Sequence, residues 1–141
     1  MLKIKKSYSV SKLRKNILFI TKDDFDFRST CGNPQDMFFY LWDQINGYLK
    51  DAVFYNIYIG DIPIAYLCIS KRTKQIAFYL DKSYRTSNTL TEMFSFIKSK
   101  IGNEFYTGTK KTNTNFIVFA AKNNWLVVEE DDKNIIFKAR I

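Results

Sequence analysis

Hydrophobic residues change their spacing several times along the chain, and each change predicts a different element. Alternating apolar and polar positions from Leu2 to Ser9 predict an edge strand, and apolar residues at helical spacing predict a helix from Ser11 to Ile20. The pair Asn33-Pro34 is typical of a helix start, and an apolar stripe extends this second helix to about Leu49. The first third of the chain is therefore expected to form a strand and two helices.

The pattern then changes to three consecutive strands. They are predicted at Val53 to Ile59, Pro63 to Ser70 and Gln75 to Leu80. Gly60-Asp61 supplies a tight turn between the first two, and the basic segment from Lys71 to Lys74 supplies the second turn. Strands joined by such short turns pair as an antiparallel meander.

The last third alternates between helices and strands. Apolar residues from Leu90 to Ile101 follow the helical i, i+3, i+4, i+7 rule, and Gly102 ends that helix. The remaining predicted elements are a short strand at Glu104–Thr107, a helix at Asn113–Asn123, and two strands at Trp125–Glu130 and Asn134–Arg140 joined by Asp131-Asp132. No repeat or linker interrupts this order, so residues 1–141 are expected to form one domain.

Two segments resemble motifs of the GNAT (GCN5-related N-acetyltransferase) superfamily. The segment from Phe78 to Arg85, which leads into a helix, resembles the fourth strand of the family and the Arg that opens its R-x-x-G-x-G/A loop. Asn113, followed by Lys122-Asn123-Asn124-Trp125, is similar to the last helix and the strand after it. The resemblance covers residues 53 to 141 and implies an α/β (α+β) fold, with a mixed, mostly antiparallel sheet of six to seven strands flanked by about four helices.

The resemblance also implies a cofactor, acetyl-CoA or another acyl-CoA. In this family the pyrophosphate rests on backbone N–H groups at a helix N-terminus, and the pantetheine arm lies along the exposed backbone of the fourth strand. An amine would attack the thioester directly, with the Leu80 amide polarising the carbonyl oxygen and Arg85 adding charge near the phosphates. The implied cofactor-binding residues are Phe78, Tyr79, Leu80, Arg85, Thr86, Ser87, Asn88, Thr89, Leu90, Thr91 and Asn113.

The loop departs from the family pattern at its two glycine positions. Asn88 stands at the first, where asparagine tolerates a left-handed backbone, and Leu90 stands at the second. The Leu90 side chain either crowds the phosphates or turns inward as the first core residue of the helix. Thr89 and Glu92 match a capping box, which would start the helix later and use its free amides on side chains.

Catalytic residues are not assigned by the pattern. The family often has a tyrosine in the last helix as general acid, and the equivalent position here is Ala120, with no tyrosine within a turn. Several tyrosines lie on the central strands, where each is expected to pack with its hydroxyl at the sheet edge; they are Tyr55, Tyr58, Tyr66 and Tyr79.

Composition limits the remaining chemistry. The chain has no His, and Cys31 and Cys68 fit no metal-ligand spacing, so His-based catalysis is excluded and no metal site is expected. No apolar run approaches the roughly 20 residues that span a bilayer, which predicts a cytoplasmic protein without a membrane partner. A monomer and a homodimer are both compatible with the sequence.

The formal net charge of +8 favours an anionic partner, which could be a polyphosphate cofactor, an acidic protein or nucleic acid. An AT-rich coding sequence would account for much of the same excess of Lys, Asn, Ile, Phe and Tyr. The basic residues cluster near the amino terminus, at Lys3, Lys5, Lys6, Lys12, Arg14 and Lys15.

Three functions follow as expectations. The first is an acyl-CoA-dependent N-acyltransferase that modifies an amine of a protein or small molecule. The second is the same fold without acetyltransferase activity, acting as a protein-binding or nucleic-acid-binding module. The third is a phage-type DNA-modification or counter-defence protein. The acceptor is not determined, because enzymes of this type select it with loops and the first two helices.

Overall fold

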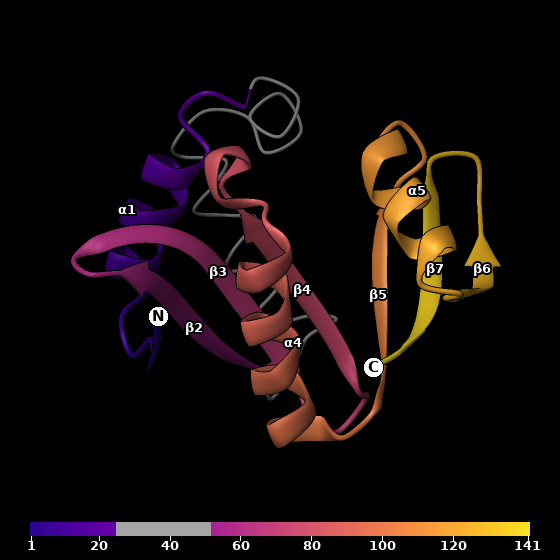
Figure 1. Ribbon diagram of the computed structural model, residues 1–141, viewed down its shortest axis with the longest axis horizontal. Helices are drawn as coiled ribbons and strands as arrows, with labels where there is room; N and C mark the ends of the chain where they lie inside the picture. Colours follow the sequence, from indigo (N-terminus) through magenta and orange to yellow (C-terminus); the bar gives the residue numbers. More distant parts are fainter. Residues whose placement is uncertain (25–51) are drawn as a thin grey trace.

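The computed structural model describes residues 1–24 and 52–141, and the predicted helix from Asn33 to Leu49 lies outside them. The centre is a seven-stranded sheet (Figure 1), whose strands in spatial order are β1 (Leu2–Lys6), β2 (Val53–Ile59), β3 (Ile62–Ser70), β4 (Gln75–Leu80), β5 (Glu104–Lys110), β7 (Asn134–Arg140) and β6 (Leu126–Glu130). The described helices are α1 (Val10–Ile20), α4 (Ser87–Ile101), α5 (Thr114–Lys122) and a short 3₁₀ helix, η1 (Lys82–Tyr84).

The predicted mixed and mostly antiparallel sheet is confirmed. All neighbouring strands are antiparallel except β4 and β5. The strand β5 is longer than predicted, because it pairs with β7 from Glu104 opposite Arg140 to Lys110 opposite Asn134. Its hydrogen-bonding partner, and not its own apolar pattern, sets its length.

The parallel pair β4 and β5 touches at one end only. Gln75 lies opposite Tyr106, and the Tyr106 amide donates to the Lys74 carbonyl at 2.8 Å. Beyond this point the two strands diverge, so that β5, β7 and β6 separate from β4 toward its carboxyl end (Figure 1). Within the described residues, the β5-facing side of β4 therefore has no strand partner over its last residues.

Two hydrophobic clusters lie on opposite faces of the sheet. On one face α1 packs against the meander through the α1-side cluster of Leu13, Ile17, Ile20, Phe54, Tyr66, Cys68 and Tyr79. On the other face α4 and α5 cover a larger α4-side cluster, which includes Ile57, Leu67, Leu80, Met93, Ile97, Phe105, Trp125 and Phe137. Helix α4 buries Met93, Ile97 and Ile101 because their i, i+4 spacing places them on one side.

Aromatic rings fill the space under α5. The Phe105 side chain is fully buried, with its ring centroid 6.2 Å from that of Phe94 and 5.7 Å from that of Trp125. The Phe116 ring, from the first turn of α5, lies 6.0 Å from the Phe78 ring of β4. These contacts connect the meander to the divergent half of the sheet.

Candidate functional site

Strand β4 ends at the opening between the two halves of the sheet. Its side chains alternate, so Phe78 and Leu80 pack in the α4-side cluster while Tyr79 packs in the α1-side cluster. The Asp81 amide donates to the Ile64 carbonyl at 2.8 Å, which continues the β3–β4 register by one pair. Because backbone groups alternate along an antiparallel strand, those of Phe78 and Leu80 face away from β3 and toward the opening.

The connection from β4 to α4 folds back on the strand end. Asp81 caps η1 by accepting a hydrogen bond from the Ser83 amide at 2.9 Å. Arg85 Nε donates to the Leu80 carbonyl at 2.8 Å, and its guanidinium carbon lies 5.4 Å from the centre of the Tyr79 ring. The Arg85 side chain therefore links the loop to the end of β4, and its exposed guanidinium remains beside the start of α4.

Helix α4 begins three residues earlier than a capping box at Thr89 and Glu92 would place it, since its N-cap is Thr86 and not Thr89, so that expectation is wrong. Thr86 is the N-cap, and its hydroxyl accepts from the Thr89 amide at 3.3 Å. The Glu92 carboxylate instead accepts from the Leu2 amide of β1 at 3.0 Å, a contact that spans 90 residues of sequence. Glu92 therefore bonds to a residue far away in the sequence, and not to the backbone amide of Thr89 as a capping box would require.

The start of α4 presents backbone amides. No described residue accepts a hydrogen bond from the amides of Ser87 and Asn88, and both residues are exposed. By contrast, the Thr86 amide donates to the Tyr84 carbonyl at 2.8 Å and the Leu90 amide donates to the Thr86 carbonyl at 3.0 Å. Of the predicted loop amides, those of Ser87 and Asn88 are the ones open to an anion.

Leu90 turns inward. Its side chain is partly buried and packs against the α4-side cluster, as expected for the first core residue of a helix. Leu90 stands where the family has Gly or Ala, but its side chain therefore does not lie above the amides of Ser87 and Asn88. The site fits a small anionic group at the level of the backbone, because its two open amides and its adjacent strand edge are both main-chain features.

We expect Leu90→Gly to destabilise the protein without improving an anion site. The substitution removes a partly buried side chain and places glycine in the first turns of a helix, which together should lower the free energy of unfolding by about 2 kcal/mol. Thermal unfolding measures the loss, and Thr91→Gly, at the exposed neighbouring position, is the matched control for the glycine effect alone. A gain in acyl-CoA affinity in Leu90→Gly would contradict the inward position of the side chain.

Asn113 and Ala120 have structural partners in α5. Asn113 is the N-cap, where its Oδ1 accepts from the Phe116 amide at 3.3 Å and its Nδ2 donates to the Thr109 hydroxyl at 3.1 Å. Ala120 is fully buried, and its carbonyl accepts from the Trp125 amide at 3.0 Å. The structure therefore places Asn113 at a helix cap and Ala120 in the core.

The four strand tyrosines occupy different environments. Tyr66 is buried in the α1-side cluster, and Tyr55 is buried with its ring 4.9 Å from that of Phe96. The Tyr58 hydroxyl, on β2, accepts from Asn16 Nδ2 of α1 at 2.8 Å. Burial, and the nearby Tyr8, raise the pKa of Tyr55 above its ordinary value.

Tyr79 contacts a buried carboxylate that the sequence pattern does not single out. Its hydroxyl donates to Asp24 Oδ2, and Asp24 is 8% exposed, with Lys82 Nζ 3.9 Å from its other oxygen. Burial, followed by the hydrogen bond to Asp24, raises the pKa of Tyr79 far above its ordinary value, so the phenol stays protonated at neutral pH. No local signal marks Asp24, because its partner lies 55 residues away.

Three further findings concern the described residues. Within residues 1–24 and 52–141, His, Cys, Asp and Glu form no group of three that could hold a metal ion. Among the helices in those ranges, none is both long and apolar enough to cross a membrane. Cys68 is a buried free thiol, and burial raises its pKa to about 12.

Comparison with known proteins gives matches at the level of structure. No family model matches the chain, and no curated protein matches its sequence. Among solved structures, the N-acetyltransferase PseH of Campylobacter jejuni in complex with acetyl coenzyme A is similar with a TM-score of 0.62 at 13% identity, over 99% of this chain and 99% of that chain. The PaiA N-acetyltransferase of Thermoplasma acidophilum in complex with coenzyme A has a TM-score of 0.63 at 14% identity, over 100% of this chain and 99% of that chain.

A third similar structure is the GNAT domain of S. lividans PAT, with a TM-score of 0.63 at 10% identity, over 99% of this chain and 90% of that chain. At sequence identities this low, structural similarity indicates a shared backbone fold but not a shared chemical activity. The matches extend over nearly the whole length of each protein. The chain therefore has the GNAT fold, as the motifs around β4 and α5 predict.

Proposed function

We propose that the protein is an acyl-CoA-dependent N-acyltransferase. The observation that carries this proposal is the position of the open amides of Ser87 and Asn88, at the start of the helix that follows β4, whose β5-facing edge has no strand partner beyond Gln75 among the described residues. The two features lie at one opening, since Arg85 Nε holds the loop to the Leu80 carbonyl. The similar structures of PseH and PaiA, which contain acetyl coenzyme A and coenzyme A, support the same ligand class.

The chain would hold an acyl-CoA through its backbone. The amides of Ser87 and Asn88 would donate to the pyrophosphate, where the helix dipole favours negative charge, and the exposed Arg85 would add positive charge. The backbone of Phe78, which faces the opening, would pair with the amides of the pantetheine arm, as a neighbouring strand would. The bound thioester would supply the activated acyl group for transfer to an amine.

One backbone group of the chain would then act at the reacting atoms. The Leu80 N–H, which faces the opening, would donate to the oxygen on which negative charge develops. The Tyr79 hydroxyl would not serve as a base, because its raised pKa keeps it protonated. Ala120, at the position of the family's general acid, has no group that can donate a proton, so transfer without another acid would be slower by about 10²-fold or more than in an enzyme that has one.

Calorimetric titration with acetyl-CoA tests the proposal. We expect binding of acetyl-CoA and of free coenzyme A, and a rise in melting temperature, because a ligand of the native state stabilises it by about 2.7 kcal/mol at 100 times its Kd. For a chain of this size that corresponds to about 8 °C. Pantetheine, which lacks the pyrophosphate, is the matched control and should produce a much smaller shift.

Absence of heat and of a thermal shift at millimolar acetyl-CoA would overturn the proposal. The alternative would then be a GNAT fold that has lost the cofactor and binds a macromolecule. If acetyl-CoA binds, release of free coenzyme A in the presence of polyamines and basic peptides, followed with a thiol reagent, identifies the class of acceptor.

A further inference from the structure

A basic surface is formed by the edge strand β1 and by α1, away from the opening beside β4. Residues 1–24 contain seven Lys or Arg side chains and two Asp, one of which is the buried Asp24. The strand β1 forms one edge of the sheet, and its Lys3, Lys5 and Lys6 are exposed. This charge is concentrated in a segment that the proposed acyl transfer does not use.

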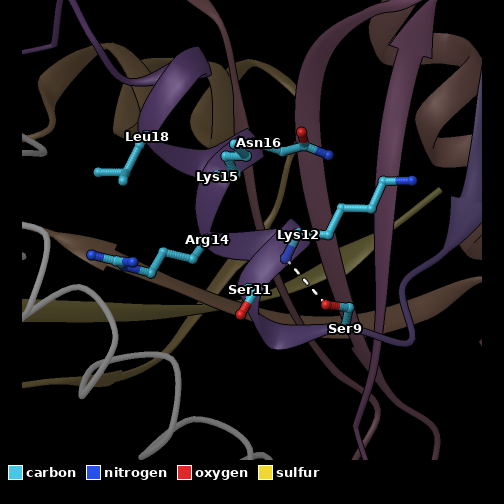
Figure 2. Close-up of a pocket in the computed structure, with 7 residues that line it drawn as sticks. All are labelled: Ser9, Ser11, Lys12, Arg14, Lys15, Asn16 and Leu18. Carbon is cyan, nitrogen blue, oxygen red and sulfur yellow. Dashed lines mark hydrogen bonds between the residues drawn. The ribbon is translucent and has the colours of Figure 1, made fainter.

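Tyr58 brings the basic residues of β1 and α1 together. Lys3 is directly opposite Tyr58 in the β1–β2 pair, so the two side chains share a face, and Lys5 Nζ lies 5.8 Å from the centre of the Tyr58 ring. From α1, Asn16 Nδ2 donates to the Tyr58 hydroxyl at 2.8 Å. Lys12 lies one helical turn before Asn16, and both side chains point to the same side of α1 (Figure 2).

Exposed aromatic rings lie among these cations. Tyr8, in the turn between β1 and α1, is 88% exposed, with Lys6 Nζ 5.4 Å from its ring centre. Phe19 is 43% exposed, with Lys22 Nζ 3.8 Å from its ring centre. Tyr58 is half-buried, so Tyr8 and Phe19 are the exposed rings, and each of the three rings lies beside a lysine ammonium group.

Beside Tyr8 the surface is hollowed. A cavity of about 340 Å³ is bounded by Lys6, Tyr8 and Ser9, and its floor contains the buried side chains of Leu13 and Phe54. An apolar floor, an exposed ring at the rim and a cation next to the ring suit a flat heteroaromatic group attached to an anion. We name Lys3, Lys5, Lys6, Tyr8, Lys12 and Tyr58 the basic–aromatic surface.

We propose that the basic–aromatic surface binds single-stranded nucleic acid, with a base on Tyr8 and backbone phosphates on the lysines of β1 and α1. The aromatic residues favour this partner, because unpaired bases offer faces for stacking, whereas duplex DNA buries them in its helix. An acidic protein would use the lysines and leave the exposed ring without a role. The proposal does not depend on binding of acyl-CoA, since none of its residues belongs to β4, to the loop after it or to α4.

Fluorescence anisotropy with a labelled oligothymidylate of about 20 nucleotides tests it, with the same-length duplex and polyglutamate as competitors. We expect the single strand to bind more tightly than the duplex, and polyglutamate not to displace it. If Lys3, Lys5, Lys6 and Lys12 each contact a phosphate, affinity should fall about 50-fold between about 50 and 200 mM salt. Lys5→Gln combined with Lys12→Gln should reduce this salt effect to about 7-fold.

Tyr8→Ala separates base stacking from charge. We expect affinity for the single strand to fall about 10-fold with the salt dependence unchanged, because stacking on the ring is lost and no phosphate contact is removed. The control is Lys98→Gln combined with Lys100→Gln, which removes the same charge from exposed positions at the end of α4 and should change affinity less than 2-fold. Melting temperatures within a few degrees of the parent protein establish that each variant is folded.

Several results would overturn the proposal. The first is that the oligonucleotide does not bind at about 50 mM salt. The second is that single strand and duplex bind equally and Tyr8→Ala has no effect. The third is that polyglutamate displaces the oligonucleotide when added at equal charge. The second result would mark a general polyanion surface, and the third an acidic-protein surface.

Discussion

Phe105→Ala is expected to lower the free energy of unfolding by about 3–5 kcal/mol, because it removes a fully buried ring from a close-packed aromatic cluster. Phe105 lies on β5, and its ring contacts Phe94 of α4 and Trp125 before β6. Loss of the ring leaves a cavity where the divergent half of the sheet joins α4. For a chain of this size the melting temperature should fall by about 10 °C or more.

Urea unfolding followed by far-UV circular dichroism measures this effect. Leu126→Ala is the matched control, because Leu126 is 65% exposed on β6 and its truncation should change stability by less than about 0.5 kcal/mol. Phe105→Leu keeps most of the volume and provides a measurement if the alanine variant does not fold. A loss below about 1 kcal/mol in Phe105→Ala would show that this cluster does not join the two halves of the protein.

Ser87→Pro is expected to weaken acyl-CoA binding about 10-fold or more while leaving the fold intact. Proline removes the Ser87 amide, one of the two open donors at the start of α4, and a hydrogen bond to a charged phosphate contributes about 1.5–3 kcal/mol. The helix should tolerate the change, because Ser87 is its first residue, where proline is favoured. The preceding residue, Thr86, already has the extended backbone (φ −109°, ψ 160°) that proline requires of it.

Calorimetric titration with coenzyme A measures the loss of affinity, and the melting temperature without ligand shows whether α4 remains folded. Ser87→Ala is the matched control: it removes the hydroxyl, keeps the amide, and should bind within about 2-fold of the parent. Equal affinity of Ser87→Pro and Ser87→Ala would mean that the pyrophosphate does not rest on this amide, even if acyl-CoA binds elsewhere. The comparison of Ser87→Pro with Ser87→Ala therefore tests where coenzyme A binds, independently of whether the protein transfers an acyl group.

The proposed anion site shows how much of a site can be predicted from local sequence. The switch from a strand at Gln75–Leu80 to a helix ended by Gly102 is predictable, since apolar period and a glycine stop are local properties, and Gly102 has the positive φ of 91° that favours glycine. The helix start is less predictable, because Thr86 and Thr89 are both good capping residues. Thr86 is the cap in the structure, and the Glu92 carboxylate, which a capping box at Thr89 would need, bonds instead to the amide of Leu2.

The sequence by itself determined the order and type of the described strands and α-helices, because alternation, helical spacing and turn residues act over a few positions, but it did not predict the 3₁₀ helix η1. It also limited the Leu90 side chain to two alternatives, crowding the phosphates of a bound acyl-CoA or packing in the core. Tertiary structure alone decided which, since the inward position of Leu90 depends on the α4-side cluster contributed by distant strands. The pairing of Tyr79 with Asp24, the link from Arg85 to Leu80 and the convergence of Lys5 and Asn16 on Tyr58 were likewise decided by the fold. Such contacts join residues that chain connectivity does not hold together, so only the packing of the whole sheet and its helices places them side by side.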